Sequence, residues 1–247
     1  MSVNPINNEI LATPPWAGRF SHKIARNRHA IGDVHGCSRT LQAMVEDVIK
    51  LGKDDILYLL GDYIDRGPDS KGVLDYLIHL REEDYDFRPL MGNHERMCLD
   101  AVSDPDNRTL WFNNGGWGTL HEFGVETPAD IPKRYLDLMA GMPRVVTTAD
   151  YVFAHAGLDF STDNPITDTS QQFMLWERNQ RFQPGKLGGR TLVHGHSVIE
   201  LFEIRASLEK PIICLDNGCY DKGHLGFGNL VALNLDTREL LIKENCE

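Results

Sequence analysis

The stretch Ile56–Gly67 reads Ile-Leu-Tyr-Leu-Leu-Gly-Asp-Tyr-Ile-Asp-Arg-Gly. Its first five residues are apolar without interruption, which predicts a strand that is buried on both faces, in a sheet covered by helices. Asp62, Asp65 and Arg66 then follow the carboxyl end of that strand, where open α/β sheets gather their functional loops. Asp62 could bridge two metal ions and Arg66 matches a phosphoryl group, but a polar turn rich in Asp and Gly explains this stretch alone equally well.

An earlier junction in the chain has the same form. Residues 28–31 are expected to form a short strand, and an apolar stripe of helical spacing begins after Ser38. We expect Ser38 to be the N-cap of that helix and Gly52 to end it. Asp33 and His35 would therefore lie in the strand-to-helix turn. In isolation, an Asp-x-His tripeptide is more often a capping acid beside an incidental histidine.

Later junctions add further polar residues at strand ends. A strand expected at 87–91 leads to Asn93 and His94, one at 151–153 leads to His155, and one at 192–193 ends at His194. A single buried histidine is more often a hydrogen-bonded core residue than a ligand. The first three successive strand–turn–helix units, which carry Asp33, Asp62 and Asn93 at the same place, nevertheless show the alternation typical of βαβ units, and their chance repetition is improbable. The candidate metal ligands at strand ends are Asp33, His35, Asp62, Asn93, His155 and a histidine of the segment His194–His196.

These candidates share a donor chemistry. Carboxylate oxygens and imidazole nitrogens without thiolates suit Mn, Fe or Zn better than a structural zinc cage. A bridging carboxylate holds two ions about 3.5–4 Å apart, the spacing used for in-line phosphoryl displacement. Such a site also needs a leaving-group acid, which His94 oriented by Asp65 could provide. It needs a cationic clamp as well, for which Arg66 and Arg178 are the candidates.

Composition limits the class of protein. The 247 residues are 41% hydrophobic, enough for a packed core, and we expect an irregular arm at 1–26 followed by one catalytic domain at 27–247. The net charge of -11 argues against a nucleic-acid-binding face. Five cysteines without CxxC spacing, no apolar run of about 20 residues and no signal pattern predict a cytoplasmic protein without membrane contact.

Two segments between the motifs carry no readable code for substrate choice. Residues 104–124 are expected to form part of a helical insertion whose aromatic side chains pack a small core. Residues 159–189 are expected to be mostly loop. We expect substrate choice to depend on these two segments.

The chain contains five motifs: GDVHG (Gly32–Gly36), GDYIDRG (Gly61–Gly67), GNHE (Gly92–Glu95), HAG (His155–Gly157) and HGH (His194–His196). In order and approximate spacing they resemble the phosphoprotein phosphatase family of metallophosphoesterases. The stretch Leu175–Arg178 resembles the bacterial and phage branch of its serine/threonine phosphatases. The resemblance spans about Arg28 to Leu235. It implies an α/β metallophosphoesterase fold, a central β-sandwich of two mixed sheets flanked by helices in four layers, α/β/β/α.

The resemblance also implies roles for individual residues. The ligands of the first metal would be Asp33, His35 and Asp62. The ligands of the second would be Asp62, Asn93, His155 and His196, with His194 outside the set. His94 would protonate the leaving oxygen with Asp65 orienting its ring, and Arg66 and Arg178 would bind the phosphate. The implied ions are two divalent metals, most simply Mn²⁺, with Fe or Zn as alternatives. Tyr220 is expected to pack rather than to bind substrate.

Three functions remain open at this stage. The first is hydrolysis of phosphoserine or phosphothreonine in proteins, with dual specificity possible and small aryl phosphates as in vitro substrates, through attack by a metal-bridging hydroxide. The second is symmetrical hydrolysis of diadenosine tetraphosphate. Related enzymes of that kind lack the Asp of DRG and carry GNHD, whereas Asp65 and Glu95 are present here. The third is an inactive phosphate-binding scaffold, although such copies usually lose a ligand or the acid. A monomer is expected in each case.

Overall fold

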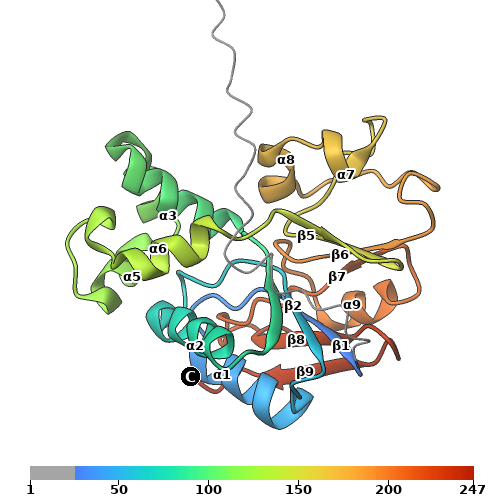
Figure 1. Ribbon diagram of the computed structural model, residues 1–247, viewed down its shortest axis with the longest axis horizontal. Helices are drawn as coiled ribbons and strands as arrows, with labels where there is room; N and C mark the ends of the chain where they lie inside the picture. Colours follow the sequence, from blue (N-terminus) through green and yellow to red (C-terminus); the bar gives the residue numbers. More distant parts are fainter. Residues whose placement is uncertain (1–25) are drawn as a thin grey trace, which may run out of the picture.

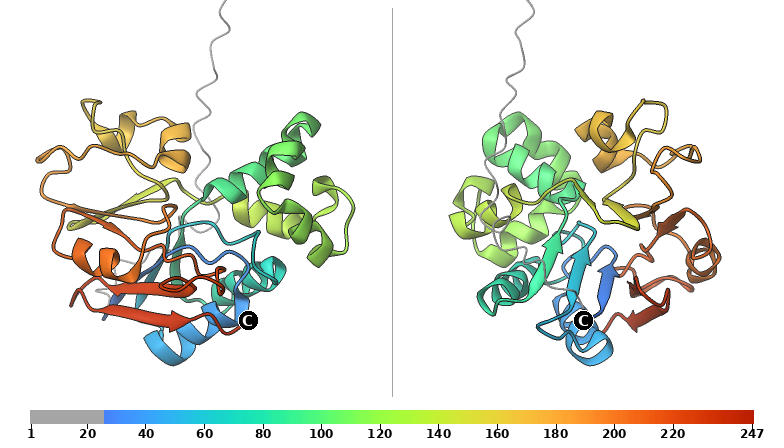
Figure 2. Two further views of the ribbon diagram at one scale, coloured as in Figure 1. Left: turned by 180° about the vertical axis from the view of Figure 1, so that it is seen from behind. Right: turned by 45° about the vertical axis from the view of Figure 1, so that its right-hand side comes forward.

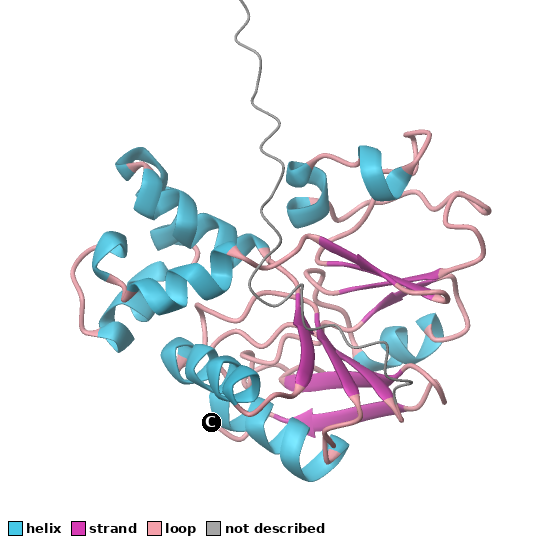
Figure 3. Ribbon diagram, viewed as in Figure 1, coloured by secondary structure: helices cyan, strands magenta, loops and turns pink. Residues whose placement is uncertain are grey.

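Residues 26–247 are described by the computed structural model, so the expected arm lies outside them except for Arg26. They form two mixed β-sheets packed face to face, with helices on the outer sides (Figures 1 and 3). The first sheet has the order β3-β2-β1-β8-β9, with strands β1 (Arg28–Ile31), β2 (Ile56–Leu59), β3 (Asp86–Pro89), β8 (Asn229–Asn234) and β9 (Leu240–Glu244). The second has the order β4-β5-β6-β7, with strands β4 (Val145–Thr147), β5 (Tyr151–Ala154), β6 (Thr191–His194) and β7 (Ile212–Cys214). The predicted fold is confirmed.

Helices cover the sheets from both sides (Figure 2). Between the sheet strands the chain forms α1 (Ser38–Ala43), the π-helix η1 (Met44–Ile49), α2 (Ser70–Glu82), α3 (Asn93–Ser103), α6 (Lys133–Ala140), α7 (Pro165–Asp168), α8 (Gln171–Trp176) and α9 (Leu201–Ser207). The predicted insertion is helical, with η2 (Pro105–Asn107), α4 (Arg108–Asn113) and α5 (Gly116–Phe123), and the short η3 (Pro128–Asp130) follows it. None of the helices in residues 26–247 has the length and apolarity needed to span a bilayer.

Alternation along the strands explains the layers. Successive side chains of a strand point to opposite faces of its sheet. In β2, Leu57 and Leu59 therefore pack toward the helices, while Tyr58 packs between the sheets. In β5, Phe153 packs between the sheets and Val152 lies on the opposite, outer face. The uninterrupted apolar run at 56–60 thus has a helical layer on one face and the second sheet on the other.

The strand pairing explains where the loops meet. Strands β1, β2 and β3 are parallel, with Ile31 opposite Leu59 and Leu59 opposite Pro89. The loops that follow these strands consequently leave the sheet at one level and on one edge. Strands β5 and β6 of the second sheet are also parallel to each other. The strand-end motifs are therefore brought together although they lie far apart in the sequence.

Both predicted boundaries of the first helix are wrong. Ser38 is the first residue of α1 rather than its N-cap, because the Ser38 hydroxyl donates to Asp69 Oδ2 instead of capping its own helix. Cys37 precedes the helix without a side-chain cap. The helical segment also ends before Gly52, since it changes to a π-helix at Met44 and closes at Lys50 with a left-handed φ of 56°.

Phe153→Ala is expected to lower the free energy of unfolding by about 3–5 kcal/mol, because it leaves a cavity between the sheets. The Phe153 ring is fully buried and stacks on Tyr58 of the opposite sheet with ring centroids 4.2 Å apart. Urea unfolding of the metal-free protein measures the change. Phe202→Ala is the matched control, since Phe202 is 64% exposed and should contribute little. A loss below about 1 kcal/mol for Phe153→Ala would contradict this account of the core.

Candidate active site and metal centre

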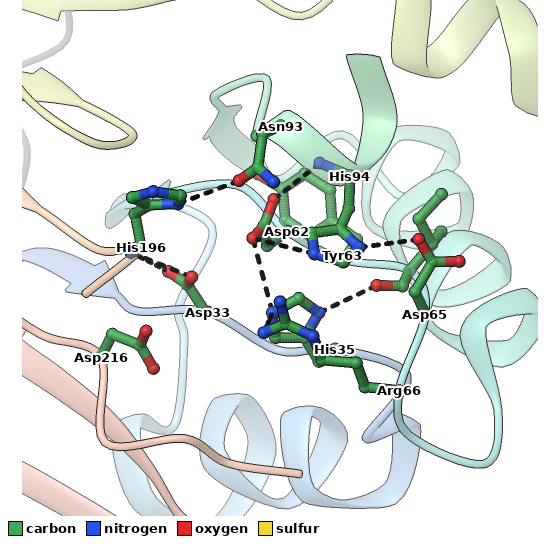
Figure 4. A network of polar contacts seen from close by, with 12 residues as sticks. Asp33, His35, Asp62, Tyr63, Asp65, Arg66, Asn93, His94, His196 and Asp216 are labelled. Carbon is green, nitrogen blue, oxygen red and sulfur yellow. Dashed lines mark hydrogen bonds and ion pairs between the residues drawn. The ribbon is translucent and has the colours of Figure 1, made fainter. Parts of the chain in front are cut away.

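Asp62 lies at the centre of the predicted cluster, and histidines from different segments of the chain surround it (Figure 4). Its Oδ2 is 3.4 Å from His35 Nε2 and 3.9 Å from His94 Nε2, and its Oδ1 is 3.4 Å from His155 Nε2. Asp62 and these histidines are all at most 2% exposed. One carboxylate thus faces three imidazole nitrogens in a site from which bulk water is excluded.

Backbone carbonyls fix the orientation of two of these imidazoles. His35 Nδ1 lies 3.0 Å from the carbonyl of Ile64, and His155 Nδ1 lies 2.8 Å from the carbonyl of Leu60. A carbonyl oxygen can only accept, so each Nδ1 carries a proton and each ring directs its Nε2 toward Asp62. This arrangement of a supporting carbonyl and a free ring nitrogen is typical of metal-ligating histidines.

Asn93 and His196 complete the other side of the cluster. Asn93 Oδ1 is 2.9 Å from His155 Nε2 and 3.0 Å from His196 Nδ1. His196 Nε2 is buried and has no hydrogen-bond partner among residues 26–247. Burial lowers the pKa of His196 to about 3, so its ring is neutral and available as a ligand at neutral pH.

The structure brings the predicted ligands into two groups that share Asp62. One group contains Asp62, His155 and His196, and the other contains His35, Asp62 and His94. Asp33 is buried beside them, and both oxygens of its carboxylate accept from the backbone N–H of His196, at 3.2 and 3.0 Å. This second group contains His94, which was predicted as the acid, and does not include Asp33, which was predicted as a ligand.

The ionisation of the site's carboxylates depends on burial and on neighbouring charges. Burial, with the nearby Asp216, raises the pKa of Asp33 well above its usual value. Burial also opposes ionisation of Asp62, but His155 and His94 outweigh it and hold its pKa well below the usual value. Burial would lower the pKa of His155, but Asp62 and Asp33 outweigh it and raise that pKa to about 10. Asp216 was not among the candidate residues that the sequence indicated.

The backbone at the site is unusual for non-glycine residues. Positive φ values occur at His35 (45°), Asp62 (53°), Asp65 (71°), Arg66 (70°) and His196 (64°). Such left-handed conformations cost about 1–3 kcal/mol each and persist only where surrounding contacts enforce them.

Glu95 provides such contacts to the central loop. Its Oε2 accepts from the backbone N–H groups of Asp62 and Gly92, both at 2.9 Å, and its Oε1 accepts from that of Tyr63 at 2.8 Å. Gly92 is required there, because a Cβ would lie 2.1 Å from Asp62 Oδ1. Glu95 belongs to the GNHE motif, but nothing in the sequence indicated that its carboxylate would accept these backbone hydrogen bonds.

His94 and Asp65 form the predicted dyad. His94 Nδ1 donates to Asp65 Oδ2 at 2.7 Å, and both side chains are fully buried. The opposite ring nitrogen, Nε2, has no hydrogen-bond partner among the described residues. A proton on Nε2 would therefore point toward the same centre as the ligands.

The predicted phosphate-binding residues lie at the rim. Arg66 Nη1 donates to His35 Nε2 at 2.9 Å, and its guanidinium lies 5.0 Å from the centre of the Tyr220 ring. Arg178 Nη1 donates to the carbonyl of His196 at 3.0 Å. The Tyr220 ring meets the His35 ring edge-on at 5.1 Å, so it packs against a site residue. His194 lies outside both groups, and its Nδ1 faces the carbonyl of Gly195 at 3.0 Å.

The donor set fits divalent cations. His35 Nε2 accepts a hydrogen bond from Arg66 Nη1 and faces Asp62 Oδ2 at 3.4 Å, so neither atom of this pair has a proton to share with the other. A cation between them removes this repulsion, and the mixture of oxygen and nitrogen donors suits a catalytic metal. Fold and site together define a metal-dependent hydrolase of phosphate esters.

The chain belongs to the calcineurin-like phosphoesterase family, whose model matches residues 29–223. It is 32% identical to serine/threonine-protein phosphatase 1 of Salmonella typhimurium over 167 residues, 66% of this chain and 73% of that protein. It is 27% identical to serine/threonine-protein phosphatase 2 of Escherichia coli over 210 residues, 82% and 92% of the two chains. A solved structure described as a candidate diadenosine tetraphosphatase shares the fold, with a TM-score of 0.64, 21% identity, and 89% and 93% coverage. The resemblance inferred from the motifs is confirmed.

Proposed function

We propose that this phosphoester hydrolase is a phosphoprotein phosphatase that removes phosphate from serine and threonine side chains, with Mn²⁺ as its metal. The observation that carries the proposal is the buried Asp62 surrounded by the imidazoles of His35, His94 and His155. The two bacterial relatives named as serine/threonine-protein phosphatases support the substrate class.

In this proposal the ligands divide into two sets. Asp33, His35 and Asp62 would hold one ion, and Asp62, Asn93, His155 and His196 would hold the other. Divalent cations there supply Lewis acidity, which activates water and neutralises phosphoryl charge. The five cysteines are free, which supports a reducing, cytoplasmic setting as part of the same proposal.

The remaining chemistry belongs to side chains of this chain. His94 Nε2 would give its proton to the leaving oxygen, while Asp65 holds the Nδ1 proton on the opposite side of the ring. The Arg66 guanidinium becomes available for the phosphoryl oxygens when His35 Nε2, its present acceptor, serves as a ligand atom. Arg178 would bind the same group from the side of the His196 loop.

A substrate panel after chelation tests the proposal. We expect the chelated protein to be inactive and added Mn²⁺ to restore hydrolysis of phosphoserine and phosphothreonine peptides. Mg²⁺, Zn²⁺ and Fe²⁺ in parallel samples test the choice of metal. Faster turnover of diadenosine tetraphosphate than of the peptides would favour the dinucleotide hydrolase. Intact metal loading without turnover of any substrate would favour an inactive phosphate-binding protein.

A further inference from the structure

We propose that Trp111 and Thr119 of the helical insertion are positioning residues that hold the Asp65 carboxylate and thereby aim His94 at the leaving oxygen. The inference rests on the proposed role of His94 as the proton donor. It assigns a catalytic purpose to a segment that sequence reasoning treated as a small aromatic core.

Both residues donate directly to Asp65. Trp111 Nε1 donates to Asp65 Oδ2 at 2.9 Å, and Thr119 Oγ1 donates to Asp65 Oδ1 at 2.6 Å. With His94 Nδ1 at 2.7 Å, the carboxylate accepts three side-chain hydrogen bonds. Asp65, His94, Trp111 and Thr119 are each at most 1% exposed. The protein itself therefore supplies the groups that orient this carboxylate.

The two donors arrive from different helices. Trp111 lies in α4 and Thr119 in α5, and each donates to a different oxygen of the Asp65 carboxylate. Because one donor is bonded to each oxygen, rotation of the carboxylate about its Cβ–Cγ bond would break both hydrogen bonds. Oδ2 is thus held toward His94 Nδ1. This keeps a proton on Nδ1 and directs Nε2 toward the cluster of ligands.

The backbone of Asp65 is held as well. Its N–H donates to Ser70 Oγ at 3.0 Å, and Ser70 Oγ lies 3.2 Å from Thr119 Oγ1. Gly115, between the two helices, has a φ of 112°, and a Cβ there would lie 3.0 Å from both Arg66 N and Asp65 Cβ. The insertion therefore packs closely against Asp65 and Arg66. Both have positive φ values, which persist only where surrounding contacts enforce them.

A mispositioned His94 would impair one step of the reaction, which is protonation of the leaving oxygen. In hydrolysis of a phosphoserine ester, the bond from phosphorus to the serine oxygen breaks and a bond from phosphorus to the water oxygen forms. His94 Nε2 gives one proton to the serine oxygen. One water proton stays on the product phosphate and the other restores the imidazolium. A leaving 4-nitrophenolate is a weak base and needs no such proton, whereas a serine alkoxide does.

The test compares these two leaving groups in Thr119→Val, which removes the hydroxyl at nearly constant volume, and in Trp111→Phe. For both variants, kcat on a phosphoserine peptide should fall about tenfold, part of the 10²–10⁴-fold effect of a general acid. On 4-nitrophenyl phosphate, kcat should fall less than about twofold, with KM nearly unchanged on both substrates. Thr119→Ser keeps the hydroxyl group and should restore the wild-type ratio of kcat on the phosphoserine peptide to kcat on 4-nitrophenyl phosphate.

Matched measurements separate positioning from a structural role. Trp117→Phe is the control for Trp111→Phe, since Trp117 lies in the same insertion, is 61% exposed and stacks on Phe112. It should leave both rates unchanged. Equal losses on both substrates in Thr119→Val, or no loss on either, would overturn the inference. If Trp111→Phe fails to fold, the comparison of Thr119→Val with Thr119→Ser still tests the inference. His94→Asn, measured on the same two substrates, is the reference. Equal losses of kcat on both substrates in that variant would contradict the role of His94 as the acid, and not only the positioning role of Trp111 and Thr119.

Discussion

Replacing His94 by Asn is expected to lower kcat on a phosphoserine peptide by about 10²–10⁴-fold, the usual contribution of a general acid. Asn keeps a polar side chain of similar reach but cannot deliver a proton at neutral pH. Metal content should remain that of the wild type, because the expected role of His94 is proton donation rather than ligation. Steady-state kinetics and elemental analysis of the purified protein measure the two quantities.

The metal measurement is essential, because His94 Nε2 lies in one of the two groups that could hold an ion. Loss of an ion from His94→Asn would show that His94 is a ligand and would contradict its assignment as the acid. Full activity would contradict both roles. His224→Asn is a suitable control, since that ring is 74% exposed and pairs with Asp221 at the surface.

The fold and the candidate ligands were predictable because both depend on local patterns. Apolar runs such as residues 56–60 define strands, and parallel pairing brings the loops after these strands to one edge. Each ligand is thus marked by its place directly after a strand. The ends of helices were less predictable, because Ser38 bonds to Asp69, a residue 31 positions away, rather than to its own backbone.

The residues that hold the site could not be predicted for a similar reason. Trp111 and Thr119 reach Asp65 across 46 and 54 positions, and a buried tryptophan or threonine looks like ordinary core in a sequence. Asp216 lies in a turn between strands of different sheets, and only the folded chain places it near Asp33. The sequence identifies residues whose chemistry is distinctive, whereas their supports have common side chains and become recognisable only through contacts.

Asp62→Asn is expected to abolish metal binding at both positions and to reduce activity to the level of the metal-free protein. The two groups of potential ligands share Asp62 and no other residue. Loss of its charge therefore removes a ligand from each, whereas His35→Asn or His155→Asn removes a ligand from one. Elemental analysis should give about two ions per chain for the wild type, about one for either histidine variant, and none for Asp62→Asn.

Thermal unfolding provides a readout that does not depend on catalysis. A ligand that binds only the folded state stabilises it by about 2.7 kcal/mol at a free concentration 100 times its Kd. Added Mn²⁺ should therefore raise the melting temperature of the wild type, raise it less in the histidine variants, and leave Asp62→Asn unchanged. The decisive result is the order of these Mn²⁺-induced shifts. A variant that is merely less stable would melt at a lower temperature but would still be stabilised by added Mn²⁺. An Asp62→Asn protein that keeps a full complement of ions, or that responds to Mn²⁺ as the wild type does, would show that the two groups bind metal independently of the carboxylate between them.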